Sequence, residues 1–120
     1  MVAFHIVIYK YPYMQVPLKD NMTRPSPVAD PQHAAHIAEI LKALAHPLRI
    51  RIVALLVGCP MHVSALTEAL EVPQAIVSQQ LRILRMRGLV RATRENGFAH
   101  YHIAEPQLYQ LVNCMEGCSI

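Results

Sequence analysis

The sequence lacks the features that mark secreted and membrane-spanning proteins. No apolar run approaches the roughly 20 residues that a helix needs to span a bilayer, and the opening residues show neither a basic segment nor a small-residue cleavage site. The three cysteines are an odd number and come without a secretory signature. We therefore expect a cytoplasmic protein with reduced thiols and no membrane partner.

Signatures of catalysis are also scarce. The chain has no glycine-rich phosphate loop. Cys59 and His62 are the only nucleophile and base that lie close together in the sequence, and no third group is evident that would orient the histidine. The sequence does not favour an enzyme.

Length and composition fit a single domain with a packed core, since 53% of the 120 residues are hydrophobic. The net charge of +3 does not by itself indicate a polyanionic partner. The positions of the charges say more, because five of the eleven Lys and Arg residues fall within thirteen positions. A solvated face is the alternative explanation of this cluster. Its members are Arg82, Arg85, Arg87, Arg91 and Arg94.

Segment 73–87 has the periodicity of a helix with two different faces. Val77, Leu81 and Leu84 share one apolar face at 3.6 residues per turn. The other side offers hydroxyl, amide and guanidinium groups, which bind base edges and phosphates in a major groove. No acidic residue occurs between Glu71 and Glu95, so we predict a helix that reads nucleic acid. Its candidate DNA-binding residues are Gln74, Ala75, Ser78, Gln79, Arg82 and Arg85.

The neighbouring segments predict a winged helix-turn-helix. Residues 63–70 repeat apolar side chains at helical spacing, and a three-residue turn leads from them into 73–87. Gly88 can end that helix in a left-handed conformation. Segment 89–103 then alternates like two strands joined by an Asn-Gly turn. Helix, tight turn, helix and two-stranded wing is the winged helix-turn-helix order.

Further helices are predicted on both sides. Asp30-Pro31 is typical of a helix start, and this helix runs to about residue 45. His46-Pro47 begins a second helix that stops at Gly58, and Glu105-Pro106 begins the last one. The last helix has one apolar stripe (Leu108, Leu111, Val112 and Met115) and follows an already complete domain. We expect it to pack against a second copy, with packing on its own domain as the alternative.

The predicted fold is therefore mainly α with a small β-hairpin, in the order α-α-α-α-β-β-α, and dimerises through its terminal helices. The DNA-binding and dimerisation domain occupies residues 30–120. Residues 1–29 form an arm that is either irregular or an edge strand, because prolines interrupt a β-rich opening. A true start at Met22 is an equal alternative.

Three segments resemble signatures of the ArsR/SmtB family of bacterial winged-helix repressors. They are LKALAHPLRIRIVALL at 41–56, VSQQLRILRMRGLV at 77–90 and AHYHI at 99–103. The resemblance implies a homodimer that binds a promoter operator and leaves it when an effector binds, usually a metal or metalloid. It also implies that five residues of the predicted helix face the major groove: Gln74, Ala75, Ser78, Gln79 and Arg82. The wing would follow the DNA backbone near Arg91 and Arg94.

The family's effector sites match this chain only in part. Arsenic-sensing members have Cys-Val-Cys where this chain reads His-Val-Ser from position 62, and of the zinc-sensing ligands only Glu105 is retained. Thiol-based persulfide sensors of the family pair two cysteines. Cys118 matches the second, whereas the first falls on Ala54, with Cys59 five residues later.

The cysteines can also be interpreted without the family. Cys114 and Cys118 are four residues apart, so a helix places both thiols on one side. Together with Cys59 they would provide three thiolates, which suit arsenite or antimony. Two thiolates with an added histidine would suit zinc or cadmium. A pair of thiols alone would suit oxidation to a disulfide or polysulfide bridge. Packing as a small buried hydrophobe is the alternative, and is favoured for Cys59 alone.

Histidines give weaker signals. His33 and His36 could meet His62 and imitate another metal site of the family, although surface histidines are common. His100 and His102 alternate on a predicted strand and are expected at the wing surface or the edge of the core. The leading hypothesis is a DNA-binding repressor released by a thiol-directed effector such as arsenite or a soft divalent metal ion. The alternatives are a persulfide or thiol-redox sensor and a ligand-independent regulator of the same fold.

Overall fold

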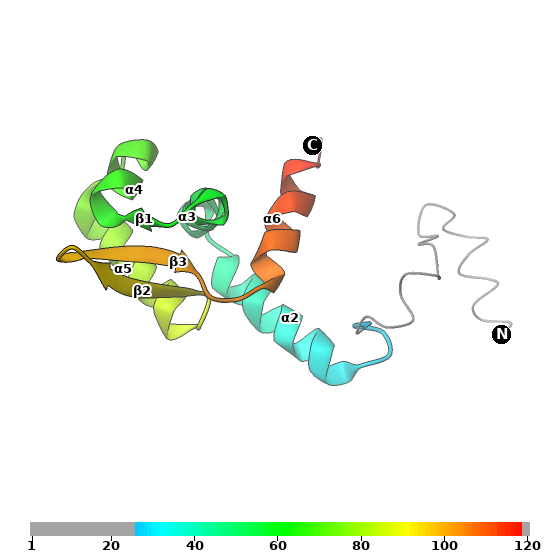
Figure 1. Cartoon of the computed structure of the whole chain (residues 1–120). Coiled ribbons are helices and arrows are strands. Elements are labelled where there is room, and N and C mark those ends of the chain that lie inside the picture. Colours follow the sequence, from blue (N-terminus) through cyan, green and yellow to red (C-terminus); the bar gives the residue numbers. More distant parts are fainter. Residues whose placement is uncertain (1–25, 119–120) are drawn as a thin grey trace, which may run out of the picture. The chain divides into compact units, whose positions relative to one another are not determined.

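The computed structural model describes residues 26–118 and confirms the predicted order of the main elements (Figure 1). The chain runs through α2 (Pro31–Leu44), α3 (Pro47–Gly58), β1 (Met61–His62), α4 (Val63–Leu70), α5 (Gln74–Met86), β2 (Val90–Glu95), β3 (Phe98–Ile103) and α6 (Gln107–Glu116). Most of the predicted arm, including Met22, lies outside the described residues. None of the helices within 26–118 has both the length and the apolar character that crossing a bilayer requires.

The chain divides into two units, the first ending at Ile37 and the second beginning at Ala38, both residues of α2. In the first unit the Asp30 side chain accepts a hydrogen bond from the Gln32 amide at 3.0 Å, as expected for the residue that caps a helix start. The second unit contains the remaining helices and the sheet. The domain boundary predicted at residue 30 stays a prediction.

Two histidines cap helices in the second unit. Nδ1 of His46 accepts a hydrogen bond from the Leu48 amide at 3.1 Å at the start of α3. Nδ1 of His62 accepts one from the Ala65 amide, also at 3.1 Å, at the start of α4. Each ring therefore satisfies an amide that has no partner within its own helix.

Helix α3 lies at the centre of the core and contacts α4, α5, α6 and β3. Spacing alone predicts a buried face on this helix made of Leu48, Ile52, Leu55 and Leu56. In the structure Ile52 and Val53 are both fully buried, whereas Leu55 is half-buried. Consecutive residues are both buried because partners cover α3 on several sides. In the stripe predicted for the last helix, Leu108 and Val112 are buried within one copy of the chain, whereas Met115 is exposed.

The end of α5 is closed by a Schellman motif. Gly88 has a φ of +75°, and its amide bonds to the carbonyl of Arg85 at 3.0 Å. The Leu89 amide reaches back to the carbonyl of Leu84 at 3.0 Å, and both leucine side chains are buried. The left-handed ending predicted at Gly88 is confirmed.

The sheet has three strands in the order β1-β3-β2, all antiparallel. The hairpin closes at Asn96 and Gly97, which have φ values of 52° and 82°, as a type I′ turn requires. The short strand β1 was not predicted and pairs His62 with His100. The Leu89 carbonyl accepts amide hydrogen bonds from Ala104 and Glu105 at 2.9 and 3.3 Å, which ties the exit of the hairpin to the end of α5.

We predict that Gly88→Ala lowers the free energy of unfolding by about 1 kcal/mol, because an L side chain is strained at positive φ. No atom lies within 4 Å of a Cβ built there, so the loss is conformational and not steric. Gly58→Ala is the matched control, since Gly58 has equal space, no positive φ and a helical position. Urea unfolding would measure both variants. Equal midpoints for the two would contradict the prediction.

Candidate nucleic-acid interface

Helix α5 separates a buried face from an exposed one, as the sequence predicted. Val77, Leu81 and Leu84 are at most 1% exposed. All six candidate DNA-binding residues of α5 are exposed, so their side chains are available to a ligand. They are Gln74, Ala75, Ser78, Gln79, Arg82 and Arg85.

Sequence reasoning missed Gln80, the one polar residue among those described that is buried. Its Oε1 has no hydrogen-bond partner within the described residues. The signal was present in the spacing, because position 80 lies three residues after Val77 and four before Leu84. Gln80 belongs to the packed side of α5 and not to the exposed surface.

The turn before α5 leaves the start of that helix open. Glu71 caps α4 in the left-handed conformation, with a φ of 55°. Pro73 occupies the N-cap of α5 and supplies no side-chain acceptor, and no acidic residue lies in the first turn. The positive end of the helix dipole is therefore not neutralised by its own side chains, which favours an anionic neighbour such as a phosphate.

Arginines extend the positive surface beyond the centre of α5. Arg82 and Arg85 line a shallow hollow of about 340 Å³ together with Met86. Arg87 lies 3.9 Å from a carboxylate oxygen of Glu39 in α2, so part of its charge is compensated. Of the five clustered arginines, Arg87 thus lies near a carboxylate, whereas Arg82 and Arg85 line the hollow.

The two wing arginines are both exposed but lie on opposite faces of the hairpin. Arg91 pairs in register with His102, and Arg94 pairs with Ala99. Since side chains alternate along a strand, positions 91 and 94 point to different sides. The prediction placed both arginines along the DNA backbone. Because they lie on opposite faces of the hairpin, a DNA backbone that follows one face would contact only one of them.

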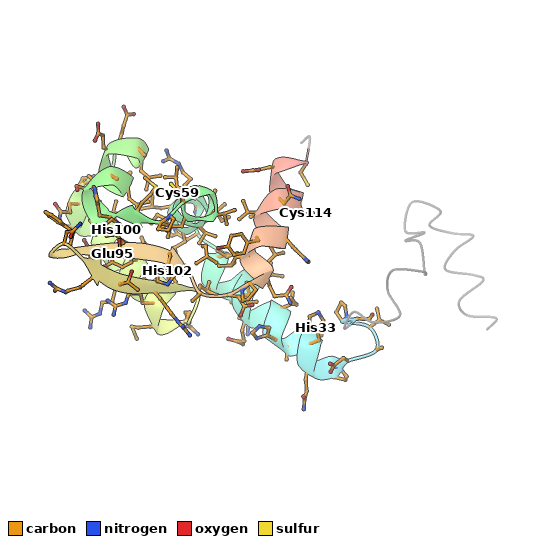
Figure 2. The ribbon with its side chains drawn as sticks, in the orientation of Figure 1. His33, Cys59, Glu95, His100, His102 and Cys114 are labelled. Carbon is orange, nitrogen blue, oxygen red and sulfur yellow. The ribbon has the colours of Figure 1, made fainter. Side chains whose placement is uncertain are left out.

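The three cysteines are free and exposed. Cys59 caps α3, so the expectation that it packs as a buried hydrophobe is wrong. Cys114 lies near the end of α6, and Cys118 follows Gly117, the residue that caps the end of this helix. Figure 2 shows Cys59 and Cys114 on different elements.

A three-ligand metal site is not formed by one copy of the described chain. No group of three or more His, Cys, Asp or Glu residues within 26–118 could hold a metal ion. One protomer therefore does not provide the predicted set of Cys59, Cys114 and Cys118 for arsenite. The separate idea that His33 and His36 meet His62 stays a prediction.

Comparisons with known proteins agree with this geometry. Residues 46–92 match the family described as "Bacterial regulatory protein, arsR family". The chain is similar to the HTH-type transcriptional regulator NmtR of Mycobacterium tuberculosis, with 38% identity over 94 residues that cover 78% of each protein.

Solved structures extend the similarity to the whole domain. The transcriptional repressor BigR from Xylella fastidiosa superposes with a TM-score of 0.71 and 31% identity, over 80% of this chain and all of that one. A homodimeric winged helix-turn-helix DNA-binding domain from Mycobacterium bovis gives a TM-score of 0.62 and 30% identity, over 79% of this chain and 87% of that one. The exposed α5, the wing and these similarities together show that the chain belongs to the ArsR/SmtB family of winged helix-turn-helix transcriptional regulators.

Proposed function

We propose that this protein is a transcriptional repressor that binds operator DNA in the cytoplasm as a homodimer and is released by a thiol-directed effector. The observation that carries the proposal is the orientation of α5. The side chains of its apolar face are at most 1% exposed, whereas Ser78, Gln79 and Arg82 on the other side of the helix are exposed. The relatives described above support a regulatory role, since they are named as a transcriptional regulator and a transcriptional repressor.

The exposed face of α5 offers two kinds of DNA contact. Ser78 and Gln79 lie in the middle of the face, where a recognition helix meets base edges in the major groove. Arg82 lies one turn further on and can bond a guanine edge or a phosphate oxygen. Arg85 in α5, with Arg91 or Arg94 on the wing, would hold the backbone on either side.

The proposed dimer uses apolar side chains that the described residues leave uncovered. Leu41 of α2 is 51% exposed, and Tyr109 and Met115 of α6 are 49% and 38% exposed. A second copy would cover these positions. The dimer would then carry two α5 helices related by two-fold symmetry, which can bind two half-sites one helical turn apart. The homodimeric domain from Mycobacterium bovis supports this assembly.

The proposed effector site is the thiol pair at the end of α6. Cys114 and Cys118 are exposed and lie beside Met115, one of the side chains assigned to the dimer interface. Thiolates prefer soft ions, so arsenite or a soft divalent metal ion is the leading class of effector. The ligand set would be completed by a partner protomer or by solvent, because no group of three possible ligands forms within residues 26–118.

A second candidate is a thiol-redox or persulfide sensor of the same fold. The exposure of Cys118 just beyond the end of α6 favours it, because an accessible thiol can be oxidised together with a neighbouring thiol. A ligand-independent regulator is the remaining alternative. In each case the DNA-binding surface is the same.

We expect Arg82→Ala to weaken operator binding by about 1–3 kcal/mol, since it removes a charged contact from the centre of the reading face. Arg51→Ala is the matched control, because Arg51 is an exposed arginine on α3 outside that face. Fluorescence anisotropy on the protein's own upstream DNA, at several salt concentrations, would measure both. Equal affinity of the two variants would count against α5 as the reader.

We expect Met115→Glu to shift the protein toward monomer, because a carboxylate in an apolar interface is costly to desolvate. Met86→Glu is the control, since Met86 is a more exposed methionine outside the proposed interface. Sedimentation velocity would give the mass of each variant. A Met115→Glu protein that stays dimeric at the same concentration as Met86→Glu would rule out this interface.

The double variant Cys114→Ser, Cys118→Ser is expected to bind the operator normally but to stay bound when arsenite, cadmium or polysulfide is added. Serine keeps the size of the side chain and removes the soft ligand. Cys59→Ser, a control at another exposed thiol, should still be released. Anaerobic gel shifts would show whether the metalloid, the metal or the polysulfide releases the protein. Release of the double variant by all three would refute a sensing role for the pair.

A further inference from the structure

Two histidines form a cross-strand pair on the outward face of the small sheet. His62 of β1 and His100 of β3 are direct partners in the antiparallel register, so their side chains lie on the same side. Their ring centroids are 5.8 Å apart and the ring planes meet at 76°. Both residues are half-buried, so the pair is held by its surroundings yet open to solvent.

Among residues 26–118, the hydrogen bonds of the His62 ring involve one of its two nitrogens. Nδ1 accepts the hydrogen bond from the Ala65 amide that caps α4. The same Nδ1 lies 2.8 Å from Oγ of Ser64, a hydroxyl that can either donate or accept. An accepting Nδ1 places the ring proton on Nε2, which is the nitrogen left for another partner.

We propose that His62 and His100 form a two-imidazole site for a divalent transition-metal cation such as Zn²⁺ or Ni²⁺, through Nε2 of His62. Imidazole nitrogen is a preferred ligand of both ions. Rings that share one tetrahedral ion have centroids about 5 Å apart, because each nitrogen lies about 2.0–2.1 Å from the metal. The observed centroid distance of 5.8 Å is close to that separation.

The surroundings define a site of low ligand number. Within residues 26–118 no third histidine, cysteine or carboxylate completes a group with the pair, so water fills the remaining positions. His102 lies further along β3 and pairs with Arg91, whose charge opposes a cation there. Figure 2 shows His100 and His102 along β3, with Glu95 on the same hairpin. Phe98, with its ring centroid 6.4 Å from that of His62, flanks the pair on its other side.

Binding of the ion changes the hydrogen bonding at α4. When Nε2 of His62 binds a metal, its ring proton moves to Nδ1, which then donates and can no longer cap the Ala65 amide. Ser64 is placed to accept the new bond at the observed 2.8 Å. The ion therefore stabilises one tautomer of His62 at the expense of the first turn of α4, the helix that packs against α5.

The test is a Zn²⁺ titration of the full chain, without DNA or affinity tag, in a Cys59→Ser, Cys114→Ser, Cys118→Ser background. Nitrogen-15 NMR of the imidazole rings reports each histidine and its tautomer separately. We expect the His62 and His100 signals to change with one shared midpoint, and His62 to convert to the Nδ1–H form. His102 should not share that midpoint.

Three variants sharpen the result. His62→Asn removes the ligand but keeps a side chain that caps helices well, and it should abolish the response of His100. Ser64→Ala should weaken binding by roughly 10-fold, as expected for loss of a partner that orients a ligating histidine. His102→Gln is the control and should bind as the parent does. Separate midpoints for His62 and His100, no response to Zn²⁺, or a His100 response that persists in His62→Asn would overturn the proposal.

Coupling to α4 has its own readout. Hydrogen exchange of the Ala65 amide should become faster when Zn²⁺ saturates the pair, because the amide loses its acceptor. An unchanged exchange rate at saturation would refute the coupling. None of these measurements involves DNA or the thiols, so their outcome is independent of the proposed repressor function.

Discussion

Burial of three aliphatic side chains sets the rotation of helix α5 about its own axis. Val77, Leu81 and Leu84 are inaccessible to solvent, and burying each stabilises the fold by about 1.5–3 kcal/mol. Turning the helix by one residue would rotate it by about 100° and expose this face. The outward position of Ser78 and Arg82 is therefore a consequence of core packing, and the reading surface needs no interaction of its own to be presented.

The elements that repeat over several turns could be predicted, whereas those without a period could not. Helices α3, α4 and α5 start and end close to their predicted residues, because capping, proline and glycine signals agree with the apolar spacing. Strand β1 has two residues and so carries no alternation to detect. Helix α3 buries both Ile52 and Val53, so the expectation of a single apolar stripe fails for a helix with partners on several sides.

The candidate sites differ in the same way. Spacing alone placed the exposed residues of α5 on one surface, since they belong to one helix. The relation of Cys59 to Cys114 depends on how two distant elements pack, and spacing within either element contains no information about that. The pairing of His62 with His100 depends on the register of an unpredicted strand. Sequence reasoning consequently assigned His100 to the wing surface or the edge of the core, without a partner.

Leu89 occupies the point where three elements meet. Its amide closes the end of α5 on Leu84, and its carbonyl holds the amides of Ala104 and Glu105 just before α6. These bonds join main-chain atoms, so substitutions other than proline keep the groups that form them. The end of α5 and the segment before α6 are thus joined through one residue's main chain, and substitutions elsewhere on either helix leave that connection in place.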